Sequence, residues 1–383
     1  MTKKEILIFI DWYEPGYKAG GPIQSVKNLV TALAHDFSFY IVTSDRDYHD
    51  QAPYKDVELN TWISLSESVN VIYLNPANQN FSTYRKILSS KLWNKILING
   101  LFSPNFSILP LLATSSKKLN TKVILSTRGM LAPAALNEKP LKKRLFLAAA
   151  NFLKLLSRVT IHATNAAEAE QIKRQLKTDK VQVISNLGKQ LISKPDYTLY
   201  KRAAELKVVS IARISPEKNT AFIFEVLALL PTFTGNIDLD IYGPINDKAY
   251  WESCIEVSKQ LPENISVNYK GSIVSAKVSS TIKQYHLLFL PSLGENYGHS
   301  IVEALANSRP VLISEHTPWQ QLNARKAGWS LPLEHRYFTK ALIEALNWSQ
   351  EDFESYIKGS WQYAKVVLDQ AQVVDEYKQL LST

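Results

Sequence analysis

The sequence is poor in cysteine, with only Cys254 among its 383 residues. One cysteine cannot form an internal disulfide or a thiolate metal cluster, so disulfide-stapled and zinc-cluster proteins are excluded. The sequence also lacks any apolar run as long as a membrane-spanning helix. Its first apolar stretch, residues 6–10, is too short for a secretion signal and is typical of a strand. Low-complexity tracts are absent, which argues against long disordered segments. We therefore expect a cytoplasmic protein.

The composition is typical of a globular protein with well-filled cores. Hydrophobic residues make up 45% of the chain and aromatic residues 10%. A length of 383 residues predicts two or three domains. The formal net charge of +9 favours anionic partners, namely nucleotide phosphates, anionic lipids or nucleic acids. Nucleic acid has the least support, because we find neither a cluster of stacking and basic residues nor a recognised nucleic-acid-binding motif.

Strand-like apolar runs alternate with helical patterns along the whole chain. In the first half, strands are predicted at residues 5–11, 37–42, 69–74, 95–98, 123–126, 159–162 and 181–184. In the second half, they are predicted at residues 208–212, 239–242, 265–269, 287–290 and 311–313. This alternation predicts an α/β fold with two doubly wound parallel sheets, whose ligands lie at the carboxyl ends of the strands. We expect domains over residues 1–188 and 200–360, a linker over residues 189–199, and a shared ligand in the cleft between the sheets.

Residues 286–313 hold the pattern that organises the second half. An apolar strand is followed by turn residues up to Gly298, then by a helical pattern and a second strand. The loop ends at a helix N-terminus, where free backbone N–H groups favour an anion. Glu295 and Glu303 flank this site. Carboxylates repel phosphate, so these two suit the hydroxyl groups of a sugar and a ribose on either side of a diphosphate. The structural alternative is that Ser300 and Glu303 form a capping box and that Glu295 is a solvated loop charge.

Two cations follow the predicted strand at residues 208–212. The Ser-Pro-Glu tripeptide at residues 215–217 predicts an N-cap, a first helical position and an acidic first turn. This places Arg213 at the strand end and Lys218 in the first turn of a helix. Such cations form a good diphosphate site, because they stabilise the charge on a leaving diphosphate without a metal. The alternative is that both are solvated surface charges.

Both patterns resemble those of a known family. Residues 294–306, Gly-Glu-Asn-Tyr-Gly through Glu-Ala-Leu-Ala, resemble the Glu-seven-residues-Glu motif of retaining GT-B glycosyltransferases, glycosyltransferase family four. Arg213 and the Lys-Asn pair at residues 218–219 resemble the Arg and Lys-Asn of the same family. The resemblance implies the GT-B fold, in which two Rossmann-like domains face a cleft. It also implies that a C-terminal helix, over residues 361–383, crosses back to the first domain.

The resemblance assigns roles to individual residues. It implies that Arg213 and Lys218 neutralise the donor diphosphate, while Glu295 binds the donor sugar and Glu303 the ribose. The implied catalytic residues are Glu295, Arg213 and Lys218, and the implied donor-binding residues are Gly20, Gly21, Glu303, Asn296, Tyr297, Gly298, Gly243 and Ile273. Asn99 and Arg128 stand where many relatives carry His-Gly and a His or Asp, so we expect both to contact the acceptor or the sugar.

Two Asp-x-Asp sequences resemble the metal motif of the other glycosyltransferase fold. They are Asp45 with Asp47, and Asp238 with Asp240. We reject both as metal sites, because the first pair follows a strand of the wrong half for the donor and the second lies within a strand pattern. No metal and no other cofactor is therefore expected.

Two other patterns receive structural interpretations. His162 is interpreted as a satisfied core histidine, and Asn165 as a helix N-cap with Glu168 as its capping-box partner. Residues 139–158 form a basic helical pattern with a broad apolar face. We favour a core-packed helix with a basic exposed side. The alternative is a helix that lies on an anionic membrane, near a lipid-linked acceptor.

The function with most support is a retaining glycosyltransferase that moves a sugar from a nucleotide-diphosphate sugar to an acceptor hydroxyl. The family's commonest setting is bacterial polysaccharide or glycan assembly. The expected partners are the nucleotide sugar and a glycan or lipid-linked glycan, with peripheral contact at the inner face of the cell membrane left open. Two other functions stay open, a GT-B nucleotide-sugar epimerase and a catalytically silent partner subunit. The partner-subunit alternative stays open because Arg128 and Asn99 replace residues that are frequent in the family.

Overall fold

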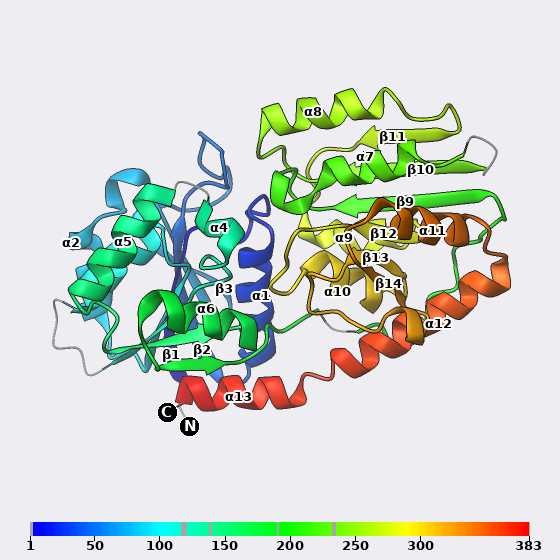
Figure 1. The fold of residues 1–383 in the computed structure, drawn as a ribbon. Helices are drawn as coiled ribbons and strands as arrows, with labels where there is room; N and C mark the ends of the chain where they lie inside the picture. The colour runs from blue at the N-terminus through cyan, green and yellow to red at the C-terminus, as the bar shows by residue number, and fades with distance from the viewer. Residues whose placement is uncertain (1–2, 116–120, 138–139, 190, 232–234, 383) are drawn as a thin grey trace. The chain divides into compact units, whose positions relative to one another are not determined.

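The chain forms two compact units. The computed structural model describes residues 3–115, 121–137, 140–189, 191–231 and 235–382. Unit 1 comprises Met1–Leu187 and Gln370–Thr383, and unit 2 comprises Gly188–Asp369 (Figure 1). Each unit is built on one sheet flanked by helices, so the predicted α/β fold with two parallel sheets is confirmed.

Unit 1 contains, within its described residues, an eight-stranded sheet in the order β3-β4-β2-β1-β5-β6-β7-β8. All neighbouring strands pair in parallel except the edge strand β3, which is antiparallel to β4. The strands are β1 (Lys4–Ile10), β2 (Phe37–Ser44), β3 (Trp62–Ser66), β4 (Val69–Leu74), β5 (Lys95–Asn99), β6 (Lys122–Ser126), β7 (Val159–Ala163) and β8 (Val181–Val183). The helices are α1 (Gly21–Leu33), α2 (Phe81–Ser90), α3 (Leu109–Ser115), α4 (Pro133–Asn137), α5 (Pro140–Phe152), α6 (Ala166–Leu176) and α13 (Ala371–Ser382), with short turns η1 (Pro76–Asn78) and η2 (Pro104–Ile108).

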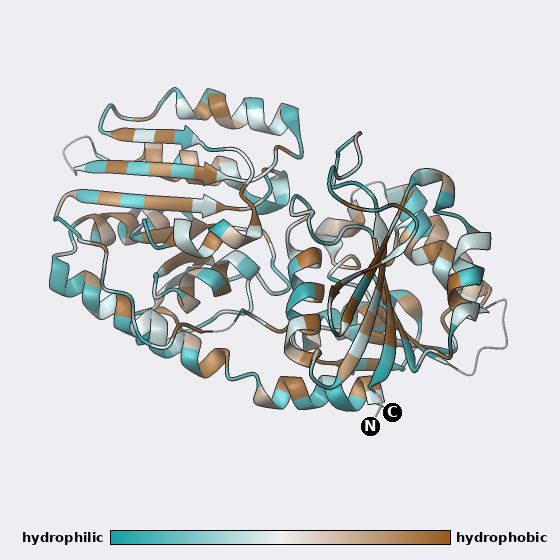
Figure 2. Cartoon of the chain, turned by 180° about the vertical axis from the view of Figure 1, so that it is seen from behind, coloured by the Kyte–Doolittle hydropathy of each residue, from teal (hydrophilic) through white to brown (hydrophobic). Residues whose placement is uncertain are grey.

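Both faces of the unit 1 sheet are buried. Along β1, Leu7 and Phe9 belong to one apolar cluster, while Ile6 and Ile8 belong to the cluster on the other face. A central parallel strand with two covered faces needs a continuous apolar run, which explains why the sequence of β1 does not alternate. In Figure 2 many strands of unit 1 are accordingly brown, whereas the helices mix brown and teal.

Unit 2 contains, within its described residues, a six-stranded parallel sheet in the order β11-β10-β9-β12-β13-β14. The strands are β9 (Glu205–Ile211), β10 (Asn236–Tyr242), β11 (Ile265–Tyr269), β12 (Leu287–Leu290), β13 (Val311–Ser314) and β14 (Gly328–Leu331). The helices are α7 (Thr220–Ala228), α8 (Lys248–Ser258), α9 (Ser275–Ile282), α10 (His299–Ala306), α11 (His335–Leu346) and α12 (Gln350–Val367), with short turns η3 (Pro216–Lys218) and η4 (Asn323–Arg325). Val208 and Val209 of β9 again point into different apolar clusters.

The C-terminal segment returns to unit 1 as predicted. Tyr377, Leu380 and Leu381 of α13 are buried in an apolar cluster with β1, β2 and α1. Figure 1 shows α13 beside the start of the chain, and Lys4 Nζ donates to the carbonyl of Ser382 at 2.8 Å. Trp361, expected to begin the returning segment, instead lies inside α12 of unit 2, where its indole N–H donates to a carbonyl of that unit.

Two edge strands were not expected from the sequence. These are β3, which is five residues long with its last three residues exposed, and β14, which is four residues long. A strand of four or five residues carries little hydrophobic periodicity, so local patterns do not reveal it. Among the described residues, every helix is too short or too polar to cross a lipid bilayer.

The helix expected within residues 139–158 packs against the core through Leu147, and its exposed side is basic only in part, because apolar side chains lie beside the exposed Lys142 and Arg144. Lys139 lies outside the described residues, and α5 begins at Pro140. The side of α5 that faces away from the core carries Leu141, Leu145 and Phe152, which are 83%, 73% and 86% exposed.

Candidate functional site

The predicted donor residues of unit 2 lie at the carboxyl edge of its sheet. Strands β9, β10, β11 and β12 run parallel, so the loops that follow them leave from the same edge. Arg213 and Lys218 follow β9, Gly243 follows β10, Ile273 follows β11, and the segment from Glu295 to Gly298 follows β12. The fold therefore brings residues from four separate stretches of sequence to one edge.

The segment after β9 differs from the helix start that the sequence predicts. Residues 216–218 form a 3-10 turn, and α7 begins only at Thr220. Asn219 adopts a left-handed conformation with φ of 57°, which interrupts the helix between the two elements. Ser215 occupies the N-cap position but makes no side-chain capping bond. Lys218 therefore lies at the end of a separate turn, and not in the first turn of α7.

The β9 turn and the β12 loop are hydrogen-bonded to each other. The Leu293 N–H donates to the carbonyl of Glu217 at 2.9 Å, and the Glu295 N–H donates to the carbonyl of His316 at 3.0 Å. Helix α10 then begins after Gly298, whose φ of 74° is accessible to glycine at little cost. The bond to Glu217 holds the Glu295 loop against the turn that carries Lys218, and the bond to His316 ties it to the segment after β13.

The structure brings Lys218 and Glu295 together. Lys218 Nζ lies 2.7 Å from Glu295 Oε1, and Ser292 donates its hydroxyl to the same oxygen at 2.8 Å. Both charged side chains are mostly buried, 17% and 10% exposed. Arg213 pairs with Glu217, with Nη2 3.0 Å from Oε1, and these side chains are 34% and 26% exposed. The interpretation of Lys218 and Glu295 as solvated surface charges is therefore wrong.

Glu303 does not form the capping box considered as an alternative. Gly298, and not Ser300, is the N-cap of α10. The Glu303 carboxylate instead lies 2.9 Å from Lys189 Nζ, and it is 7% exposed. Lys189 also donates to the carbonyl of Ser275 at 3.3 Å. The predicted ribose ligand is therefore a nearly buried carboxylate whose cation comes from the segment that begins unit 2.

The other predicted donor residues of unit 2 are largely packed into its fold. Tyr297 is buried, with its ring 5.2 Å from that of Trp319, and neighbouring Asn296 is half-buried. The Gly243 N–H donates to the carbonyl of Gly271 at 2.9 Å, which joins the turns after β10 and β11. Ile273 is half-buried against the apolar cluster on the α10 side of the sheet.

In unit 1, the glycine loop lies between β1 and α1. Gly20 is the N-cap of α1 with φ of 68°, and Gly21 is the first helical residue. The loop before them is anchored by Asp47, whose carboxylate accepts the N–H groups of Tyr17 and Lys18 at 2.7 and 3.1 Å. A Cβ at position 20 would meet no atom within 4 Å, so glycine is needed there for its backbone conformation and not for space.

Asn99 and Arg128 lie together at the carboxyl edge of the unit 1 sheet. Arg128 Nε donates to Asn99 Oδ1 at 2.6 Å, and Arg128 Nη1 donates to Asn186 Oδ1. Burial lowers the pKa of Arg128, and Tyr377 and Glu168 oppose that shift. The structure thus places the two predicted contact residues side by side, with part of the guanidinium engaged by side chains of unit 1.

Sequence reasoning missed Asp11 and Lys189. Asp11 directly follows β1, and the Ser103 hydroxyl donates to its Oδ1. Burial raises the pKa of Asp11 to about 6, and the Ser103 hydrogen bond only partly opposes this shift. Its position directly after a buried parallel strand is a signal that the sequence already contained. Lys189 had no comparable signal, because its partner is distant in sequence.

The rejected Asp-x-Asp pairs bond to protein groups. Asp45 pairs with Arg46 at 2.8 Å, and Asp47 anchors the glycine loop. Asp238 accepts from Ser266 and Asp240 from Tyr285, both at 2.6 Å. Within the described part of the chain, no group of three or more His, Cys, Asp or Glu side chains is arranged to hold a metal ion.

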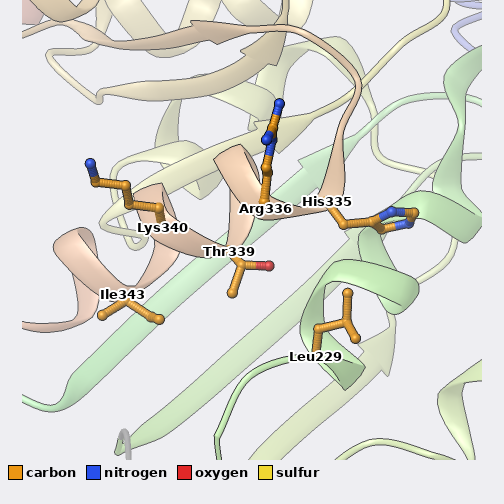
Figure 3. Close-up of a pocket in the computed structure, with 6 residues that line it drawn as sticks. All are labelled: Leu229, His335, Arg336, Thr339, Lys340 and Ile343. Atoms are coloured by element: carbon orange, nitrogen blue, oxygen red, sulfur yellow. The ribbon is translucent and has the colours of Figure 1, made fainter.

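One surface depression of about 600 Å³ lies away from these residues. It is lined by Leu229, His335, Arg336, Thr339, Lys340 and Ile343, which come from α11 and the end of α7 (Figure 3). Its lining is mainly apolar and includes none of the predicted site residues. His335 is engaged by Glu225 at 2.8 Å and stacks on Phe222. We do not assign the donor to this depression.

Comparison with known proteins agrees with the geometry. Residues 199–358 match the family described as "Glycosyl transferases group 1". The matched segment is less than half of the chain. It contains Arg213, Lys218, Glu295 and Glu303, and it covers most of unit 2. No curated protein matches the sequence.

The whole chain is similar in fold to GT-B glycosyltransferases. HepE of Anabaena, solved with UDP and glucose, is 14% identical with a TM-score of 0.69, and the similarity covers 100% of both chains. Sucrose-phosphate synthase of Thermosynechococcus elongatus is 16% identical with a TM-score of 0.69, over 99% of this chain and 98% of that one. A TarM mutant of S. aureus, solved in a complex containing UDP, is 12% identical with a TM-score of 0.70, over 99% of this chain and 100% of that one. The predicted GT-B fold is confirmed. The family match supports glycosyltransferase activity.

Proposed function

We propose that this chain is a retaining glycosyltransferase that moves a sugar from a nucleotide-diphosphate sugar to an acceptor hydroxyl in bacterial polysaccharide or glycan biosynthesis. The observation that carries the proposal is the Lys218–Glu295 pair, 2.7 Å apart, at the carboxyl edge of the sheet within the segment that matches glycosyl transferases group 1. A cation suits the diphosphate and a carboxylate suits the sugar hydroxyls, so the pair offers both halves of donor recognition. Solved complexes of HepE and TarM that contain UDP support a nucleotide sugar as donor.

Arg213 and Lys218 bind the diphosphate in this proposal. Their contacts with Glu217 and Glu295 hold both cations near the end of β9. Arg213 is a third exposed and can turn its guanidinium towards phosphate oxygens, which it binds bidentately. Negative charge grows on the diphosphate as the sugar–phosphate bond breaks. Cations fixed at that position stabilise the transition state more than the ground state, so the reaction requires no metal.

The two glutamates bind hydroxyl groups on either side of the diphosphate. Glu295 accepts hydrogen bonds from the donor sugar, and Ser292 and Lys218 hold its carboxylate in place. Glu303 accepts hydrogen bonds from the ribose, and Lys189 holds its carboxylate in place.

The acceptor binds to unit 1, with Asn99 and Arg128 as contacts to acceptor or sugar. The acceptor hydroxyl attacks from the face that the diphosphate leaves, so that the configuration at the anomeric carbon is retained. A phosphate oxygen of the donor accepts the proton of that hydroxyl. We propose a glycan or lipid-linked glycan as the acceptor and the cytoplasm, at the inner face of the cell membrane, as the setting.

The donor is tested by a thermal-shift screen with uridine, guanosine and adenosine diphosphate sugars, because a ligand that binds the folded state raises the melting temperature. Transfer is then measured with the stabilising donor, with and without a chelator. We expect transfer in both conditions. Glu295→Gln and Arg213→Ala should each lower kcat at least about 100-fold, the usual effect of removing one group that stabilises transition-state charge.

Matched surface variants control for the loss of any charge. Glu263 is exposed, and Arg336 forms an exposed pair with Glu334, so Glu263→Gln and Arg336→Ala should keep full activity. Full activity of both Glu295→Gln and Arg213→Ala would contradict the proposal. Formation of an epimeric sugar from the donor alone would identify the epimerase alternative instead.

A further inference from the structure

Helix α5 carries an apolar face on each of its two sides. Leu147 and Ala150 are buried, and Leu147 belongs to an apolar core cluster of unit 1. On the other side, Leu141, Leu145 and Phe152 are 83%, 73% and 86% exposed. With 3.6 residues per turn, these three positions fall within an arc of about 40°. They therefore form one outward stripe. Apolar residues scattered singly over a surface are common and need no explanation, whereas a continuous stripe does.

Cations border this stripe. Lys142 and Arg144 are exposed and fall on opposite sides of it around the helix. Lys154 and Arg158 are exposed in the turns that follow α5. Residues 140–158 contain five Lys or Arg and no Asp or Glu. The exposed surface of residues 140–158 is therefore an apolar stripe with positive charges along its margins.

This combination distinguishes between possible occupants of the stripe. A second copy of the chain would bring one row of cations against another, and that repulsion disfavours a dimer through α5. An anionic lipid bilayer satisfies both features at once, because apolar side chains enter the boundary between headgroups and acyl chains while cations bind the lipid phosphates. We propose that the α5 surface, defined by Leu141, Lys142, Arg144, Leu145 and Phe152, docks on an anionic lipid bilayer.

Docking would hold unit 1 at the membrane without a spanning helix. The α5 surface is independent of the residues proposed to bind the donor, so lipid binding does not depend on the proposed function. The consequence of lipid binding does depend on the proposed function. If the chain is a glycosyltransferase whose acceptor binds unit 1, docking brings that unit to lipid-linked acceptors. The two ideas can fail separately.

The test is co-sedimentation of the full chain with vesicles, in the absence of any sugar donor. We expect binding to phosphatidylcholine vesicles that contain phosphatidylglycerol, and little binding to phosphatidylcholine alone. The double variant Leu145→Ser, Phe152→Ser should bind at least about tenfold more weakly, because two apolar side chains no longer leave water. The double variant Lys142→Gln, Arg144→Gln should bind roughly 25-fold more weakly, at about fivefold for each cation.

Two controls test for non-specific effects. Leu229, 60% exposed, and Lys358, also exposed, lie in unit 2, so Leu229→Ser and Lys358→Gln should bind vesicles like the unmodified chain. Circular dichroism melting shows whether each α5 variant is folded. Equal binding to both kinds of vesicle, or unchanged binding by both α5 variants, would overturn the proposal. So would a dimer, seen by light scattering, that is lost in the Leu145→Ser, Phe152→Ser variant.

Discussion

Glu168 illustrates how single residues are held in this protein. It is 1% exposed, and both of its oxygens accept hydrogen bonds. The Thr127 hydroxyl and the Gly129 N–H donate to Oε1, each at 2.6 Å, and the N–H and hydroxyl of Thr164 donate to Oε2 at 2.8 and 2.6 Å. Burial alone would raise the pKa of Glu168, but these hydrogen bonds together lower it below its ordinary 4.5. Glu168 thus fixes the backbone on both sides of Arg128.

We predict that Glu168→Gln destabilises the fold by about 1–3 kcal/mol at neutral pH, because its amide group would face the Thr164 or Gly129 N–H donors. The folded-state pKa lies below the unfolded one, so the stabilisation by Glu168 is present above pH 4.5 and is lost as pH falls through the folded-state value. Urea denaturation near neutrality and in acid should therefore show a difference between the two proteins that shrinks in acid.

Glu170→Gln is the matched control, because Glu170 lies on the same helix and is exposed with Lys173 as its partner. Its effect should be small. A difference between the unmodified chain and Glu168→Gln that grows on acidification would show that the sign of the pKa shift is wrong.

At the scale of elements, the turns after the strands decide where the site residues lie. Gly243 closes the turn after β10 with φ of 146°, and a Cβ there would lie 1.8 Å from the carbonyl oxygen of Ala212. Gly271 also has a positive φ, of 73°, but a Cβ would meet no atom within 4 Å. The first glycine is required by both space and conformation, the second by conformation alone.

We predict that Gly243→Ala costs about 3 kcal/mol or more, because the new methyl group overlaps with backbone that cannot move aside. Gly271→Ala should cost about 1 kcal/mol, the strain of a positive φ. Gly294 has neither constraint, so Gly294→Ala should be nearly neutral. Chemical denaturation of the three variants provides the comparison, and equal losses at positions 243 and 271 would refute the role of the close approach to Ala212.

At the scale of the whole molecule, unit 1 is completed by the far end of the chain. Leu381 of α13 is 1% exposed and packs in the same cluster as Ile8 of β1. The Tyr377 hydroxyl lies 3.3 Å from His162 Nε2 in the same unit. The other ring nitrogen of His162 contacts the Ser126 hydroxyl, and burial lowers its pKa to about 4. The interpretation of His162 as a satisfied core histidine is confirmed.

We predict that Leu381→Ala destabilises unit 1 by about 2–5 kcal/mol, the usual cost of a leucine-sized cavity. Hydrogen exchange should then speed up in β1 and α1, which share the cluster with α13, more than in the strands of unit 2. Asp375→Asn, at an exposed position of the same helix, should leave exchange unchanged. Faster exchange confined to unit 2 would contradict the assignment of α13 to the core of unit 1.

Local patterns predicted part of the candidate site and not the rest. The strands β9 and β12 are recognisable because apolar runs between turn residues are local features, so the positions of Arg213 and Glu295 after strands were predictable. The N-cap Asn165 is also confirmed, since capping is local. Its expected box partner, Glu168, bonds to Thr164 instead, and two further donors, Thr127 and Gly129, reach it from the loop after β6.

The sequence by itself determined the alternation of strands and helices, the number of sheets and the strand ends at which charged residues occur. Each of these follows from a periodicity or turn preference within a few residues. Only the tertiary structure decided the partner of each charge and the direction of each helix face. Lys218 meets Glu295 from 77 residues away, and α5 turns Leu141 and Leu145 outward, because contacts between distant segments depend on how the whole chain packs.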